Sequence, residues 1–171
     1  RFVADTFLFY ESNTWYMFAE ILNNGNNQGD LTVATTPDGL HWNHQQIVLN
    51  ETWHLSYPYI FKFNGMYYMI PETYKITEIR LYKATNFPTT WSYVATLVSG
   101  RDFVDSSIFR YNGKWWMFTS DTTNSNCYLY YSDKLTSGWV QHPMSPIVVG
   151  DASKARPGGR AFVYNNNKII R

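Results

Sequence analysis

The chain has 171 residues, a length that supports one sizeable hydrophobic core rather than two. Aromatic residues make up 19% of it and charged residues only 16%, which excludes a disordered, coiled-coil or helix-bundle chain and favours β-strands. The net charge of +1 at pH 7 gives no electrostatic signature of a nucleic acid or of an acidic membrane surface as a partner.

Cofactors and direct membrane insertion are not predicted. The single Cys127 allows neither an internal disulfide nor a cysteine-based zinc site, and the histidines at 41, 44 and 142 lack the spacing of metal ligands. No apolar run reaches transmembrane length and no signal peptide is visible. The glycosylation triplet at residues 50–52 leaves the compartment open, with a secreted or lumenal location as the preferred interpretation.

The first predicted element is a hairpin over residues 4–20, ADTFLFYESNTWYMFAE. An alternating apolar strand leads into a short polar turn at residues 12–14, and an aromatic strand follows and closes on Glu20. This alternation indicates strands with a buried face. A third strand at 31–34, a turn that ends at Trp42 and a short fourth strand at 45–49 complete the unit.

The same unit returns along the chain. Its second and third copies begin with HLSYPYIFKFNGMYYMIPET at 54–73 and VDSSIFRYNGKWWMFTSD at 104–121, and a fourth begins with GRAFVYNNNKII at 159–170. The second copy turns at Asn64-Gly65, and its second strand closes on Glu72. The third copy turns at Asn112-Gly113, and its second strand closes on Asp121. The equivalent starting positions are 52, 48 and 54 residues apart: Asp5, Tyr57, Asp105 and Gly159.

Four strands and one tryptophan at a period near 50 residues describe the blade of a β-propeller. The sequence therefore predicts an all-β fold of four-stranded antiparallel blades at about 4–50, 54–100 and 103–150, with a partial fourth from 155. The aromatic side chains are expected to pack between neighbouring blades. Since three and a half blades cannot close a ring, the missing blades are expected from a continuation of the chain or from a second copy.

Several motifs resemble known propeller families. ATTPDGLHW, SDKLTSGW and an aspartate at the start of an inner strand resemble the five-bladed propellers of glycoside hydrolase families 43, 32 and 68. IRLYKATNFPTTWS, ARPGGRAFVY and the two long hairpins at 54–72 and 103–120 are more similar to the N-terminal propeller of glucosamine inositolphosphorylceramide transferases and its bacterial relatives. The resemblance covers essentially the whole chain and implies five blades and a sugar-binding funnel.

The resemblance to family 43 also implies roles for individual residues. Asp5 matches the general base of those hydrolases, and Asp105 matches the aspartate that modulates the general acid. The fourth unit reads KARPGGRAF and offers no carboxylate for the acid. Unless Glu20 or Glu72 takes its place, the pair of carboxylates needed for glycoside hydrolysis is incomplete.

Each candidate residue also has a structural interpretation. Asp5 and Asp105 are expected at the channel mouth, as catalytic groups or as acceptors of backbone N–H groups. Glu20, Glu72 and Asp121 close equivalent strands, and such residues form either a second ring around the mouth or a structural contact repeated in every blade. Glu72 is the weak third catalytic candidate, because Pro71 fixes the backbone before it.

Four further residues are candidates for substrate binding. Arg156 and Arg160 flank Pro157-Gly158-Gly159 and either bind an anionic group or neutralise Asp5 and Asp105. His54 and Tyr57 begin the second unit and are interpreted as a sugar-contacting pair or as structural residues.

The leading functional prediction is a propeller that recognises a carbohydrate or glycolipid head group in a glycan-processing protein. It is predicted to be non-hydrolytic, or accessory to a glycosyltransferase. A family 43-like glycosidase and a propeller used for protein assembly, which would expose an apolar patch, are the alternatives.

Overall fold

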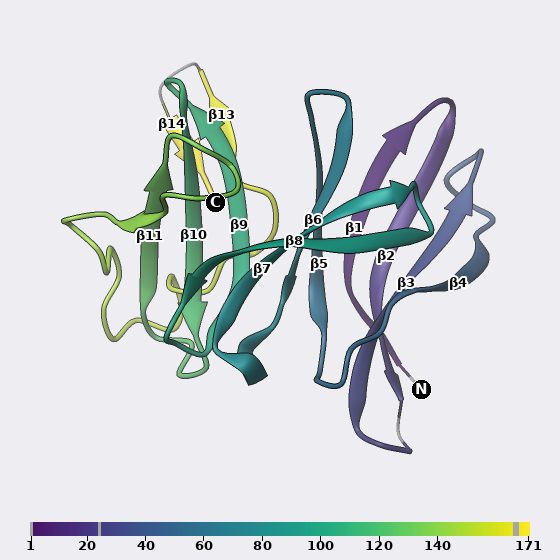
Figure 1. Cartoon of the computed structure of the whole chain (residues 1–171), viewed down its shortest axis with the longest axis horizontal. Coiled ribbons are helices and arrows are strands. Elements are labelled where there is room, and N and C mark those ends of the chain that lie inside the picture. The colour runs from purple at the N-terminus through teal and green to yellow at the C-terminus, as the bar shows by residue number, and fades with distance from the viewer. Residues whose placement is uncertain (1, 24, 166–167) are drawn as a thin grey trace.

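A computed structural model describes residues 2–23, 25–165 and 168–171, and all of its extended sheets are antiparallel. Figure 1 shows the sheets of the first and third units on either side of the second. The predicted all-β fold of four-stranded blades is confirmed. Within the described residues, no helix combines the length and the apolar character needed to cross a membrane.

Each blade follows the order of its strands along the chain. The first consists of β1 (Val3–Glu11), β2 (Thr14–Asn23), β3 (Gln28–Thr36) and β4 (Asn43–Leu49). The second consists of β5 (Ser56–Phe63), β6 (Met66–Glu72), β7 (Glu78–Asn86) and β8 (Thr90–Ser99), with a short 3-10 turn, η1 (Tyr74–Ile76), after β6.

The third blade consists of β9 (Phe103–Tyr111), β10 (Lys114–Asp121), β11 (Cys127–Ser132) and β12 (Val140–Gln141). Its last strand has only two residues, and Pro143 and Pro146, which carry no N–H for a ladder, follow it closely. The fourth unit contributes the hairpin of β13 (Phe162–Tyr164) and β14 (Lys168–Ile170). Residues 166–167 of this predicted hairpin lie outside the described residues.

The three long hairpins turn at the predicted positions. Both central residues of each turn have positive φ, as a type I′ turn requires, between 48° and 77°. Asparagine and glycine tolerate this conformation better than other residues. The turn residues are Ser12-Asn13, Asn64-Gly65 and Asn112-Gly113.

Aromatic rings fill the spaces between blades, as predicted. Phe18 of the first blade meets Trp91 of the second edge to face, with the ring centroids 5.9 Å apart. Phe63 of the second blade meets Trp115 of the third in the same way at 4.8 Å. Because the wedge between twisted sheets is wide, large flat side chains fill it best, and this packing fixes the three inner strands β1, β5 and β9 around one channel.

Candidate functional site

The inner strands share an irregular backbone at one end of the channel. The antiparallel register shifts between Ala4 and Phe7 in β1 and between Ser56 and Tyr59 in β5, and β9 shifts at the equivalent place opposite Phe118–Ser120. The residue inside each irregularity has positive φ, which is uncommon without glycine and is found repeatedly at functional sites. The equivalent residues of the four units are Asp5 (51°), Tyr57 (45°), Asp105 (51°) and Gly159 (134°).

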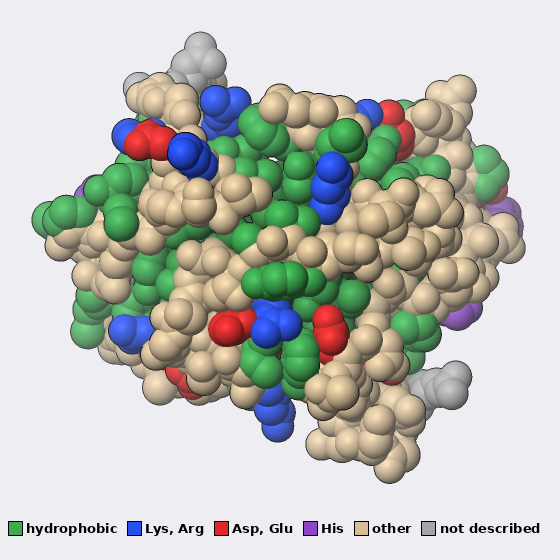
Figure 2. Space-filling model, viewed as in Figure 1, with side chains coloured by type: hydrophobic (Ala, Val, Ile, Leu, Met, Phe, Trp, Pro, Cys, Tyr) green, Lys and Arg blue, Asp and Glu red, His purple; other side chains and the backbone are tan. Residues whose placement is uncertain are grey.

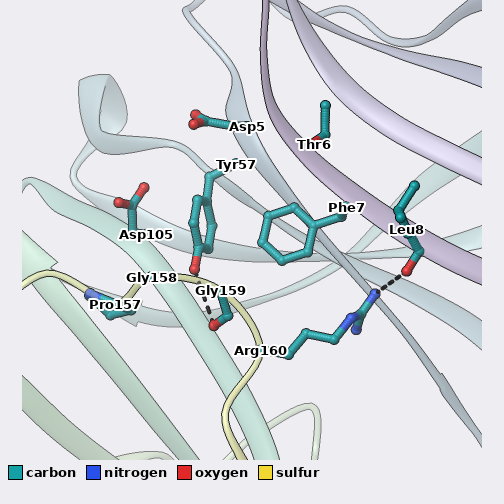
Figure 3. Close-up of a pocket in the computed structure, with 10 residues that line it drawn as sticks. All are labelled: Asp5, Thr6, Phe7, Leu8, Tyr57, Asp105, Pro157, Gly158, Gly159 and Arg160. Atoms are coloured by element: carbon teal, nitrogen blue, oxygen red, sulfur yellow. Dashed lines mark hydrogen bonds between the residues drawn. The ribbon is translucent and has the colours of Figure 1, made fainter.

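These four residues lie around one hollow of about 450 Å³. Figure 3 shows Asp5 and Asp105 on either side of Tyr57, with Arg160 at the other end of the hollow. The structure therefore brings together residues that are about 50 and 100 positions apart in the sequence. The hollow is lined by Asp5, Thr6, Phe7, Leu8, Tyr57, Asp105, Pro157, Gly158, Gly159 and Arg160.

Arg156 joins two of the candidate carboxylates. Its Nε donates to Oδ2 of Asp105, and its Nη2 lies 3.8 Å from Oε2 of Glu72. The backbone N–H of Asp105 also donates to Glu72 Oε2, at 3.2 Å. Burial, followed by the charge of Asp105, raises the pKa of Glu72 to about 8. Oδ1 of Asp105 is buried without a hydrogen-bond partner.

Asp5 is the exposed carboxylate of the hollow. Within the described part of the chain it forms no ion pair. Partial burial raises the pKa of Asp5, the charge of Asp105 raises it further, and a hydrogen bond from the backbone of Tyr57 opposes both. Asp5 is therefore the carboxylate with the most freedom to meet a ligand.

Glu20 lies behind Asp5 and contacts His54. The imidazole Nδ1 accepts the backbone N–H of Gly29 at 2.9 Å, so the neutral ring carries its proton on Nε2, which lies 3.4 Å from Glu20 Oε1. Burial, with a smaller contribution from the charge of Asp5, raises the pKa of Glu20 to about 7. Burial also lowers the pKa of His54. Glu20 is 5% exposed and does not line the hollow.

Asp121 occupies the equivalent position in the third blade but has different neighbours. Its carboxylate accepts hydrogen bonds from the side chains of Thr123, Asn126 and Tyr128. Burial opposes ionisation, yet these hydrogen bonds lower the pKa of Asp121. Asp121 does not line the hollow. Its hydrogen bonds to Thr123, Asn126 and Tyr128 stabilise the turn between β10 and β11.

Arg160 and Tyr57 connect the fourth unit to the other blades. The Arg160 guanidinium donates to the carbonyls of Ile60 and Leu8 and lies over the Tyr59 ring, 5.1 Å from its centroid. The Tyr57 hydroxyl donates to the carbonyl of Gly159 at 3.3 Å. Arg156 thus pairs with an aspartate, whereas Arg160 binds main-chain carbonyls.

The structure adds residues that the sequence analysis did not single out. Ser107 donates to the Gly159 carbonyl at 2.7 Å and lies 3.0 Å from the Tyr57 hydroxyl, which fixes the loop of the fourth unit. Its position two residues after Asp105 in β9 is the signal that could have identified it. Gly29, which orients His54, leaves no comparable signal because its contact spans 25 residues.

Hydrophobic and charged side chains gather together on one face of the molecule. Figure 2 shows a band of hydrophobic side chains along the middle of the visible face, with basic and acidic groups within the band. Among the described residues, no group of three or more histidine, cysteine, aspartate or glutamate side chains is arranged to hold a metal ion. The site can contact a ligand by hydrogen bonding and charge pairing through carboxylates, a phenol and backbone groups.

The fold and the hollow define a β-propeller of the kind found in family 43 and family 62 glycoside hydrolases. A thermostable family-43 glycoside hydrolase superposes with a TM-score of 0.74 at 12% identity, over 98% of this chain and 64% of that one. The catalytic domain of Coprinopsis cinerea GH62 α-L-arabinofuranosidase superposes with a TM-score of 0.69 at 18% identity, over 95% and 55%. At such identities the likeness shows the fold alone.

The sequence places the chain in one family. A family model described as glucosamine inositolphosphorylceramide transferase 1, N-terminal, matches residues 1–171, and the chain belongs to this family. Glucosamine inositolphosphorylceramide transferase 1 of Oryza sativa subsp. japonica is 40% identical over 175 residues, and that of Arabidopsis thaliana is 37% identical. Each match covers 98% of this chain and 23% of the relative, so the chain spans about a quarter of their length.

Proposed function

We propose that this propeller recognises a carbohydrate in a glycan-processing protein and binds it without hydrolysis. The supporting observation is the distribution of carboxylates. Among the residues that line the hollow only Asp5 and Asp105 carry one, and Asp105 is paired with Arg156. Glycoside hydrolysis needs a base and a free acid on the two sides of the scissile bond.

In the fourth unit a glycine stands where a carboxylate could have served as the general acid of a hydrolase. Gly159 is equivalent to Asp5 and Asp105 in the fourth unit, and it presents its carbonyl to Tyr57 and Ser107. Glu20 and Glu72, the possible substitutes, are 5% and 7% exposed and lie behind the lining residues. This arrangement favours binding over acid catalysis.

The charge of the site suits a sugar that carries a protonated amine. Two carboxylates line the hollow, Asp5 and Asp105, and Arg156 pairs with Asp105. An ammonium group near the unpaired Asp5 would gain a charge-assisted hydrogen bond. The names of the relatives include glucosamine, a sugar of this kind.

Binding and turnover of the full-length protein test this proposal together. Methyl glycosides of glucosamine, N-acetylglucosamine and glucose would be titrated by calorimetry and assayed for release of free sugar. We expect saturable binding that is strongest for glucosamine, no release, and a loss of about tenfold in affinity for Asp5→Asn. Asp133→Asn, in an exposed ion pair with Lys114, is the matched control and should bind normally.

A glycosidase is the second candidate, favoured by one observation. Glu20 and Glu72 have pKa values raised to about 7 and about 8, and an acid that keeps its proton at neutral pH is what leaving-group protonation requires. Sugar release that disappears in Asp5→Asn with the fold intact would support this candidate and reject the non-hydrolytic proposal.

A further inference from the structure

A second hollow lies beside the first blade, between the β2–β3 turn, the segment that connects β4 to β5, and the turn η1. Its volume is about 220 Å³. It is bounded by the first two blades, both of which are complete four-stranded sheets. The lining residues are Asn26, Asn27, Gln28, Thr52, Trp53, His54 and Lys75.

This hollow is adjacent to the carboxylate site through one pair of residues. His54 lines it and also faces Glu20, whose pKa responds to the charge of Asp5 in the first hollow. The charge of Asp5 acts on His54 as well. His54 therefore lies within electrostatic range of Asp5, which borders the first hollow.

The charge of the second hollow is opposite to that of the first. None of its lining residues is acidic, and Lys75 supplies a positive charge close enough to oppose protonation of His54. Among the described residues Lys75 has no acidic partner; its ammonium lies 5.5 Å from the Tyr74 ring centroid. Outside the lining, Glu20 Oε1 lies 3.4 Å from His54 Nε2. The charge of Asp30 in β3 also acts on His54, and Asp30 Oδ1 accepts a hydrogen bond from Gln28 at 3.3 Å.

The remaining lining groups are polar and include hydrogen-bond donors. The amides of Asn26 and Asn27 and the hydroxyl of Thr52 border the hollow, and the indole N–H of Trp53 is buried without an acceptor. A buried donor without a partner is costly unless a ligand or water satisfies it. These donors, together with a lysine that has no acidic partner among the described residues, can bind an oxyanion.

The wall of the hollow is fixed before any ligand arrives. Gly29 donates to His54 Nδ1, and its carbonyl accepts the N–H of Leu55 at 2.9 Å. The side chain of Gln28 donates to the carbonyl of Glu51 at 2.5 Å. These bonds link β3 to the segment before β5, so little ordering is left to oppose binding.

We propose that this second hollow is a subsite for an anionic group, a phosphate or a carboxylate, attached to the sugar bound in the first hollow. The attachment to that sugar rests on the proposed function, whereas the anion preference rests on Lys75, the donors and the absence of acids in the lining. Together the two hollows would select a ligand with a cationic or neutral sugar in the first hollow and an anionic group that reaches the second.

The test uses the full-length protein and three probes with one sugar scaffold: methyl glucoside, glucose 6-phosphate and glucuronic acid, with inorganic phosphate as a fourth. Affinity is measured by calorimetry, and the Trp53 indole N–H and the His54 ring are followed by NMR. We expect the anionic probes to shift these signals and to lose about threefold to fivefold in affinity in Lys75→Gln, an effect that salt weakens. Lys134→Gln, at an exposed lysine of the third blade, is the control and should change nothing.

The outcomes separate the subsite from the proposed function. If the anionic probes leave Trp53 and His54 unperturbed, or bind Lys75→Gln as tightly as the unaltered protein, the subsite is wrong even where neutral or amino sugars bind. If phosphate binds in a Lys75-dependent way while no sugar binds at Asp5, the subsite stands and the proposed function fails. A preference between phosphate and carboxylate identifies the anion.

Discussion

Arg156 is the side chain on which the carboxylates at the channel mouth depend. It pairs with Asp105 and lies 3.8 Å from Glu72, both of which are buried. We expect Arg156→Met to lower the free energy of unfolding by about 2 kcal/mol, because two buried acids lose their counter-charge. The loss should be larger at pH 9 than at pH 6, and denaturant unfolding at the two pH values measures it.

Two variants separate this effect from a loss of packing. Adding Glu72→Gln to Arg156→Met should recover part of the stability at pH 9, since it removes one of the unpaired charges. Arg110→Met removes an arginine that lies over the rings of Phe63 and Trp115 and forms no ion pair within the described residues, so it should show no such pH dependence. Equal losses at both pH values would contradict the electrostatic explanation.

At the scale of the element, β3 passes so close to the segment before β5 that only glycine fits at position 29. A Cβ there would lie 2.4 Å from the Leu55 carbonyl oxygen, 2.7 Å from Glu20 Oε1 and 2.8 Å from His54 Cε1. We expect Gly29→Ala to destabilise the protein by about 2–3 kcal/mol and to release His54 from its contact. Thermal unfolding and the NMR signals of the His54 ring report the two effects.

Gly158→Ala is the matched control for this prediction. No atom lies within 4 Å of a Cβ at position 158, so the alanine should be accommodated with little change in stability. If Gly29→Ala proved as stable as Gly158→Ala, the close approach of β3 to the second blade would not hold the two blades together.

At the scale of the whole molecule, Glu20 and Glu72 make stability depend on pH. Their pKa values, about 7 and about 8, exceed the ordinary value of 4.5. Between these values the folded protein binds more protons than the unfolded chain, so the free energy of unfolding falls as pH rises. We expect this fall from about pH 5 to pH 8, and Glu72→Gln should flatten its upper part, as measured by urea unfolding across the range.

Glu11→Gln is the control for that pH series. Glu11 forms an ion pair with Lys62 at the end of β1 far from Asp5 along the strand, and its loss should leave the slope between pH 5 and 8 unchanged. Stability that stayed constant or rose with pH over this interval would contradict the raised pKa values of the two glutamates.

Most of the fold could be predicted because its signals are local. Asn64-Gly65 and Asn112-Gly113 specify type I′ turns within four residues, and the alternation around them specifies which faces are buried. Repetition at about 50 residues then identified the blades, and it aligned Asp5, Tyr57, Asp105 and Gly159, which the structure gathers around one hollow.

The contacts of the charged residues could not be predicted in the same way. Arg156 and Arg160 are four residues apart with similar flanks, yet one pairs with Asp105 and the other with main-chain carbonyls. The geometry of the loop at 157–159 decides between them. Glu20, Glu72 and Asp121 are equivalent in sequence, but their neighbours come from different segments and shift their pKa values in opposite directions.

The sequence by itself therefore determined the propeller blades, their turns and the residues that face the channel, since periodicity, turn chemistry and aromatic packing are properties of short segments repeated along the chain. The tertiary structure alone decided which carboxylates are paired, which are buried and which one is free. Those properties depend on contacts such as Arg156 with Asp105, which span 51 residues and form only when separate blades pack together.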